Sequence, residues 1–347
     1  MGLRFWRRIQ LLPGITLNLS KSGGSLSFGP RGAKFTVGPR GKRATAGLPG
    51  TGLFYTTPLE DKGRRRRGAG APAAPTVPAR DRLDLNFFQR LITPAGEEAL
   101  VDGCRALSQG DEAGALKHLQ QATDLADGAF LAGFLALKRQ DFDRAIAWLN
   151  QAIENSPRLG RYFTRYGIAA TLSLPITEEV TAHLGPDRRG VWLGLAEAHQ
   201  GRGEIEAAID WLEQLRRNRP EDVVARLSLA ELLLERGAED PGTCHRVVTL
   251  AQDIDNETAI HATLLLYKAR ALRGLGMLTP ARDTLTRALR RKKDRPEELL
   301  QTLRFERAEV YAELGHKARA RREWEKLYAE APEYRDVAER LGIRRDP

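Results

Sequence analysis

The chain is poor in the residues that build metal centres and disulfide frameworks. Its 347 residues include two cysteines and six histidines. Cys104 and Cys244 have no Cys-x-x-Cys partner, and no histidine stands four residues from another, so the spacing predicts no metal site. Unpaired cysteines are typical of a reducing compartment, and we therefore expect a cytoplasmic protein.

Motifs that mark catalysis are also missing. The glycine-rich stretch at 47–52 lacks the Gly-Lys-Ser/Thr of a phosphate-binding loop, and no helix-forming sequence follows it. No nucleophile with a neighbouring base stands out either. We expect no enzyme, no bound cofactor and no catalytic residue.

Long apolar runs are absent as well. The longest mostly apolar stretch, 129–137, has about half the length that a membrane-spanning helix needs. Near the start, Arg7, Arg8 and Pro13 interrupt the apolar residues, which is unlike an export signal. The sequence therefore predicts neither a membrane span nor an export signal.

Positive charge is concentrated at the amino end. The formal net charge is +10. Residues 1–82 hold 16 Lys and Arg against three acidic residues, whereas the rest of the chain holds 39 against 42. From residue 83 onward the chain is slightly acidic, so we expect any contact with a polyanion to come from the first part.

Residues 1–57 predict a small antiparallel β-domain. Apolar and polar residues alternate at 15–20, 26–28 and 33–37, and turns rich in Gly and Pro separate these runs. Hairpins or a small meander follow from this pattern. A domain of this size has a small core and exposed strand edges, so it could support self-association or docking.

Residues 58–82 predict a flexible basic linker, because Pro, Ala and Gly follow a run of four arginines. Clustered guanidinium groups bind phosphate backbones, which makes this run the candidate polyanion contact. Its members are Arg64, Arg65, Arg66 and Arg67. A solubilising role, an acidic or nucleic-acid partner and a membrane surface all remain open.

The first region carries specific motifs. The chain opens with Met-Gly-Leu-Arg-Phe and continues with Leu-Asn-Leu-Ser-Lys-Ser-Gly at 17–23, Gly-Pro-Arg-Gly at 29–32 and Leu-Pro-Gly-Thr-Gly-Leu at 48–53. These motifs closely resemble the bacterial family of unknown function 4236. The resemblance implies a bacterial origin and supplies no activity.

From about residue 96 the sequence repeats with a period of about 34 residues, and small residues recur at positions 8, 20 and 27 of each unit. Four copies align directly, a fifth starts near Ala262, and a degenerate copy spans 223–253. The pattern resembles tetratricopeptide repeats. We therefore expect a mainly α fold, an α-solenoid at 83–347, in which an insertion at 158–190 breaks the period.

The repeat register also selects residues that could bind a partner. In tetratricopeptide arrays the first helix of each repeat lines a concave groove, chiefly through positions 2, 5, 9 and 12. The candidate groove residues are Phe130, Phe134, Glu197, Glu231, Arg270, Arg273, Phe305 and Glu309. Phe134 and Phe305 could equally pack against a neighbouring helix, and the groove glutamates could instead hold the basic linker.

These patterns favour a non-enzymatic protein-protein interaction scaffold that binds a peptide or protein in the repeat groove. The β-domain would then be an assembly module or a second recognition module. The alternative is nucleic-acid or polyanion binding through the basic amino-terminal region.

Overall fold

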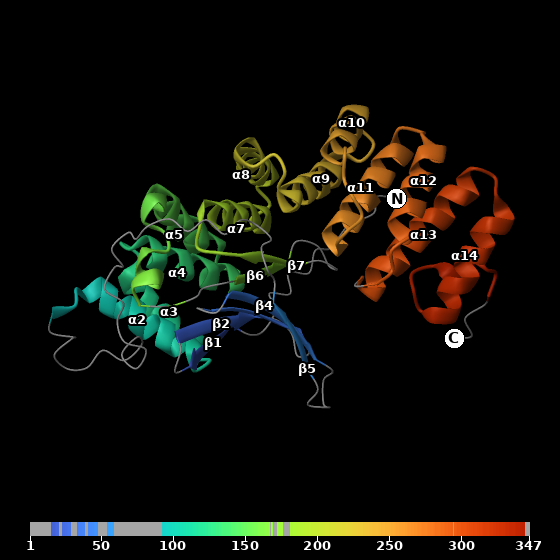
Figure 1. Ribbon diagram of the computed structural model, residues 1–347. Helices are drawn as coiled ribbons and strands as arrows, with labels where there is room; N and C mark the ends of the chain where they lie inside the picture. The colour runs from blue at the N-terminus through green and yellow to red at the C-terminus, as the bar shows by residue number, and fades with distance from the viewer. Residues whose placement is uncertain are drawn as a thin grey trace, which may run out of the picture. The chain divides into compact units, whose positions relative to one another are not determined.

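The computed structural model describes five strands between residues 15 and 58, and then residues 92–166, 168, 172–175, 181–293 and 295–343. The run Arg64–Arg67 lies outside the described residues. The strands are β1 (Ile15–Ser20), β2 (Gly23–Phe28), β3 (Ala33–Gly38), β4 (Gly41–Gly47) and β5 (Phe54–Pro58). They pair antiparallel in chain order, as Figure 1 shows in blue. That they form a separate domain stays a prediction.

The rest of the described chain is mainly helical, as the sequence predicts. The described chain as a whole divides into two compact units. The amino-terminal unit includes the strands and the helices through Trp211, and the carboxy-terminal unit starts at Leu212. The amino-terminal unit contains α2 (Ala95–Ser108), α3 (Glu112–Leu119), η2 (Gln120–Ala122), α4 (Ala126–Lys138), α5 (Phe142–Glu154), η3 (Ser156–Arg158), α6 (Arg161–Arg165) and α7 (Arg188–Gly201). Helix α8 (Ile205–Asn218) contains the boundary.

The carboxy-terminal unit continues with further helix pairs and ends on a short helix. Its helices are α9 (Val223–Gly237), α10 (Pro241–Leu250), α11 (Ala259–Gly274), α12 (Leu278–Leu289), α13 (Glu297–Glu313), α14 (Lys317–Glu330) and α15 (Val337–Arg340). Helix α11 packs against α9, α12 and α13, so the first helices of successive repeats are neighbours. This is the arrangement that a helical repeat predicts.

Small side chains let the two helices of a repeat approach closely. The alanines at positions 8, 20 and 27 are at most 5% exposed, namely Ala115, Ala122, Ala145, Ala152, Ala196, Ala208, Ala230, Ala269, Ala281, Ala288, Ala308 and Ala320. A Cβ atom added at Gly103 would lie 2.6 Å from Leu119 Cγ, and one at Gly133 would lie 2.7 Å from Leu149 Cγ. A position-8 glycine therefore has no room for a side chain.

The turns within the repeats depend on a left-handed residue. Gly110, Gly203, Gly276 and Gly315 have φ angles between 72° and 81°, and the second repeat places Gln140 at the same position with φ 60°. In the first and second repeats an aspartate follows, and its side chain caps the next helix. Position 15 thus fixes where these five helix pairs turn.

The insertion at 158–190, between the second and third repeats, contains little helix. Among its described residues, α6 is the one helix before α7, and it has five residues. After it, β6 (Leu172–Pro175) and β7 (Thr181–Leu184) pair antiparallel. Gly167 disfavours a longer helix, and the pairing of β6 with β7 joins two separate segments, which the periodicity within either segment does not report.

Two buried carboxylates hold α6 against the first repeats. Asp127 of α4 accepts hydrogen bonds from the backbone N–H groups of Gly160, Tyr162 and Phe163 at 2.5, 2.8 and 3.2 Å. Burial raises the pKa of Asp127, although these three bonds favour the charged form. A carboxylate thus caps a helix from 33 residues away in the chain.

Glu97 of α2 holds the other end of α6. Its Oε2 atom accepts from the Tyr166 hydroxyl at 2.8 Å and from Arg165 Nη1 at 2.8 Å. Burial, and then the hydrogen bond to Glu97, raise the pKa of Tyr166 to about 12. Tyr166 is buried, so it fixes the insertion in place and is not exposed to a partner.

Changing Gly133 to Ala should destabilise the amino-terminal unit, because the added methyl group would force Leu149 away from its close contact. We expect the free energy of unfolding to fall by about 1–3 kcal/mol in urea denaturation followed by circular dichroism. The matched control is Gly96→Ala in α2, where a Cβ atom would meet only Leu125 at 3.7 Å. A Gly133→Ala chain as stable as the control would contradict this packing.

The stability that Tyr166 contributes should depend on pH. Its pKa is raised from 10.0 to about 12, so folding favours the protonated hydroxyl. That contribution is complete below pH 10 and is lost as the pH rises through about 12. We expect the difference in unfolding free energy between the wild type and Tyr166→Phe to shrink across this interval. A difference that stays constant would show that the hydroxyl does not bond to Glu97.

Candidate functional site

The groove candidates of the amino-terminal unit are buried. Phe130 has no exposed surface and Phe134 is 8% exposed, and their ring centroids lie 4.9 Å apart. Helix α7 covers them, because Cβ atoms added at Gly190 and Gly194 would lie 3.3 Å from Phe130 and 2.7 Å from Phe134. The prediction that these rings line a groove is wrong, since they pack between α4 and α7.

Glu197 of α7 occupies the same repeat position as Phe134 and is also buried, at 5% exposure. It therefore offers little surface to a partner or to the basic linker. The residues predicted to line a groove in the amino-terminal unit are thus buried between its own helices. What remains of the predicted groove lies on α9, α11 and α13.

A row of charged and aromatic side chains crosses the first helices of the carboxy-terminal unit. Arg270 Nη2 of α11 lies 2.8 Å from Glu306 Oε1 of α13. Arg273 lies 3.6 Å from Glu306 and 3.8 Å from Glu309, and it also pairs with Glu313. Two arginines of one repeat therefore meet three glutamates of the next.

The row extends in both directions. Toward α9, the Tyr267 hydroxyl donates to Glu231 Oε1 at 3.1 Å, and Arg270 lies 5.4 Å from the centroid of the Tyr267 ring. Toward α15, Arg340 lies 2.9 Å from Glu309 and 5.5 Å from the centroid of Phe305. We call the side chains Glu231, Tyr267, Arg270, Arg273, Phe305, Glu306, Glu309, Glu313 and Arg340 the inner row.

Burial shapes the electrostatics of the inner row. It raises the pKa of Glu309, and Arg340 and Arg273 offset only part of this effect. Burial would lower the pKa of Arg273, but the hydrogen bond and charge of Glu313, with Glu306 and Glu309, raise it overall. Phe305 is buried at 7% exposure against Leu327 and Val337. The structure therefore brings five of the predicted groove residues together, but their contacts are with other members of the inner row.

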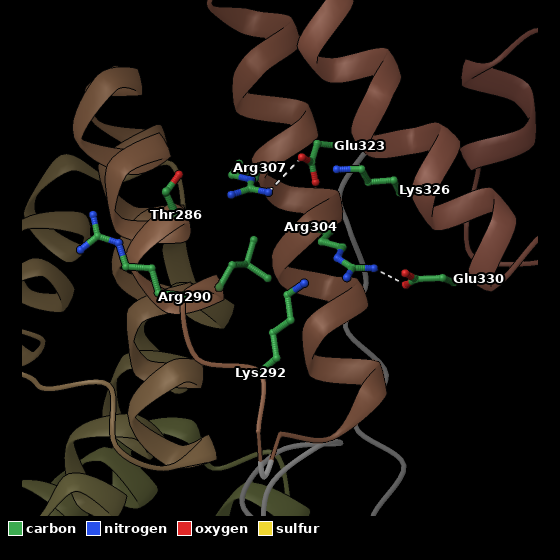
Figure 2. A pocket seen from close by; sticks show the side chains of 9 residues that line it. Thr286, Arg290, Lys292, Arg304, Arg307, Glu323, Lys326 and Glu330 are labelled. Atoms are coloured by element: carbon green, nitrogen blue, oxygen red, sulfur yellow. Dashed lines mark hydrogen bonds and ion pairs between the residues drawn. The ribbon is translucent and has the colours of Figure 1, made fainter.

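A pocket of about 490 Å³ opens elsewhere on the same unit, between α12, α13 and α14 (Figure 2). Five basic and two acidic side chains line it, an excess of three positive charges. The lining residues are Thr286, Leu289, Arg290, Lys292, Arg304, Arg307, Glu323, Lys326 and Glu330. We call this cavity the basic pocket.

Two arginines of the basic pocket are already paired. Arg307 Nη2 donates to Glu323 Oε1 at 2.9 Å, and Arg304 pairs with Glu330. The Nε atom of Arg307 is buried and has no hydrogen-bond partner among the described residues. Each guanidinium group thus keeps donors that its carboxylate does not occupy.

The two lysines of the pocket have no acidic partner in the part of the chain that the structure describes, and both are exposed. Lys292 extends between α12 and α13, whereas the end of Arg290 points away from α13 (Figure 2). Sequence reasoning missed this pocket because the charge was averaged over the whole array. The run Arg290-Arg291-Lys292-Lys293 was the available signal.

Other kinds of site find little support in the described residues. No group of three or more His, Cys, Asp or Glu side chains there could hold a metal ion. Cys104 and Cys244 are buried, and burial raises the pKa of the Cys104 thiol to about 12, which makes it a weak nucleophile. None of the described helices has the length and apolar character needed to cross a membrane.

Comparisons with known families agree with the repeat architecture. Residues 3–56 match the model of a "protein of unknown function (DUF4236)". Residues 100–159 and 189–232 match two models described as "tetratricopeptide repeat". A comparison with curated proteins finds no match.

Several solved structures are similar. The C-terminal part of a TPR repeat-containing protein from Cytophaga hutchinsonii has a TM-score of 0.51 at 12% identity, covering 76% of this chain and 94% of that one. The N-terminal domain of the EccA1 ATPase of the ESX-1 secretion system from Mycobacterium tuberculosis has 0.48 at 16%, covering 71% and 88%. A thermophilic TPR protein from Thermus thermophilus has 0.38 at 17%, covering 62% and 97%.

At 12% identity the likeness to the Cytophaga structure shows the fold alone, and the family models locate the repeats. The buried small residues and the left-handed turns recur at the repeat positions that the sequence pattern predicts. The chain therefore carries tetratricopeptide repeats, preceded by a segment of the family of unknown function DUF4236.

Proposed function

We propose that this protein is a non-enzymatic interaction scaffold whose repeats bind a peptide or protein segment. The observation that carries the proposal is the inner row, which gathers polar side chains from four consecutive repeat elements, α9, α11, α13 and α15. An extended segment lying across these helices could contact several repeats at once. Tetratricopeptide repeats are generally non-catalytic, which agrees with this role.

The paired charges of the inner row affect how binding would work. A partner has to replace Arg–Glu pairs within the protein by pairs with itself, so these charges contribute to selectivity more than to affinity. A partner of the wrong charge pattern leaves half-buried groups such as Glu309 unpaired, at a cost in binding free energy. The inner row therefore favours a partner that offers both acidic and basic groups.

The amino-terminal segment has a separate place in this proposal. Its strands would act as a second recognition module or as an assembly module, tethered by the basic linker. A cytoplasmic location belongs to the proposal as well, on the basis of the cysteine usage. A second candidate function, nucleic-acid or polyanion binding, is favoured by the 16 basic against three acidic residues in 1–82, Arg64–Arg67 among them.

One affinity experiment separates the two functions. The full-length protein is used to capture partners from its native cell, with and without nuclease, and the captured molecules are identified by mass spectrometry. A scaffold should retain the same proteins after nuclease treatment and after Arg64–Arg67 are changed to Ser. A polyanion binder should capture nucleic acid and lose it with the Ser change and with rising salt.

A variant of the inner row tests the surface itself. Arg273→Gln removes the cation that meets Glu306, Glu309 and Glu313, so we expect it to change which proteins are captured. The matched control is Arg282→Gln, whose pair with Asp283 lies within α12. Circular dichroism should show that both variants keep the wild-type helix content. Identical capture by the wild type and both variants would contradict a role for the inner row.

A further inference from the structure

The basic pocket lies on a different surface from the inner row. On α13, Arg304 and Arg307 are one turn apart and share a face, whereas Glu306 and Glu309 lie on the roughly opposite face at 3.6 residues per turn. The remaining walls are the end of α12, which contributes Leu289, and one side of α14, which contributes Lys326. The pocket is thus built where the second helix of one repeat meets both helices of the next.

The charges of the pocket are not balanced from within. Glu323 and Glu330 each engage one arginine, which leaves Lys292 and Lys326 without an acidic partner among the described residues. The buried Nε donor of Arg307 is also unsatisfied there. These features specify an anionic ligand that offers carboxylate or phosphate oxygens.

The lining decides between the macromolecules that could supply such oxygens. No aromatic side chain lines the pocket, so it has no platform on which a base could stack. Leu289 is buried at its wall beside Thr286, which suits a short apolar side chain. Glu323 and Glu330 confine the positive potential to a small area, which suits a short acidic cluster better than a continuous phosphate backbone.

We propose that the basic pocket binds an acidic peptide segment of a partner, in which Asp or Glu side chains flank an apolar residue. Lys292 and Lys326 meet the carboxylates, Arg304 and Arg307 donate from the edges that Glu330 and Glu323 leave open, and Leu289 contacts the apolar side chain. This inference rests on the proposed scaffold function and assigns one partner chemistry to one site outside the inner row.

The test uses the full-length protein and a fluorescein-labelled peptide of repeated Glu-Glu-Leu triplets. Fluorescence anisotropy measures its dissociation constant for the wild type and for the double variant Lys292→Gln, Lys326→Gln. The matched control is Lys293→Gln with Arg322→Gln, which removes two exposed charges from the same segments but not from the pocket lining. A Gln-Gln-Leu peptide and a single-stranded oligonucleotide of equal charge are the comparison probes.

The proposal expects the acidic peptide to bind the wild type and the control variant equally, and the pocket variant about tenfold more weakly. The neutral peptide should not bind, and the oligonucleotide should bind the control variant more weakly than the wild type. An equal loss of affinity for the acidic peptide in the pocket variant and the control variant would overturn the proposal, since it would show general charge attraction. Equal affinity for the wild type and the pocket variant would place the peptide elsewhere on the array.

Failure here can be told apart from failure of the scaffold function. If the wild type does not bind the acidic peptide but still captures nuclease-resistant protein partners, the pocket assignment is wrong and the scaffold function stands. If neither the peptide nor any such partner is retained, both are wrong. An oligonucleotide that binds more tightly than the peptide and is lost from the pocket variant would also overturn the assignment to peptides.

Discussion

The close approach of the two helices within each repeat is the constraint on which the rest of this structure depends. Gly133 faces Leu149 with no room for a Cβ atom, and alanines with at most 5% exposure hold the equivalent positions in other repeats. Because one surface of each helix is used for this contact, the remaining surfaces carry the polar side chains that can face a partner. Both the inner row and the basic pocket occupy these remaining surfaces.

The two surfaces differ in how their charges are satisfied. In the inner row, arginines of α11 meet glutamates of α13, and Arg340 of α15 closes the row against Glu309. In the basic pocket, two arginines are paired while, among the described residues, two lysines and a buried guanidinium donor are not. A surface whose charges are paired internally selects among partners, whereas a surface with unpaired positive charge attracts negatively charged ligands.

Much of the fold could be predicted from the sequence, since small residues at fixed positions report a local helix pair. The burial of Phe130 and Phe134 could not, because it depends on α7, which follows an insertion of irregular length. The β6–β7 hairpin was missed because its pairing is not a local periodic signal. The pocket was missed because net charge sums over helices that lie on different faces, while the run at 290–293 is concentrated at one turn.

Hydrogen exchange of the full-length protein, with and without the Glu-Glu-Leu peptide, tests most directly that this is a scaffold with a separate acidic-peptide site. The account predicts slower exchange in segments 286–293 and 304–330, which contain the lining of the basic pocket, and unchanged exchange in α9 and in α15. Slower exchange across α9, α11 and α15, with unchanged exchange in α12 and α14, would contradict it.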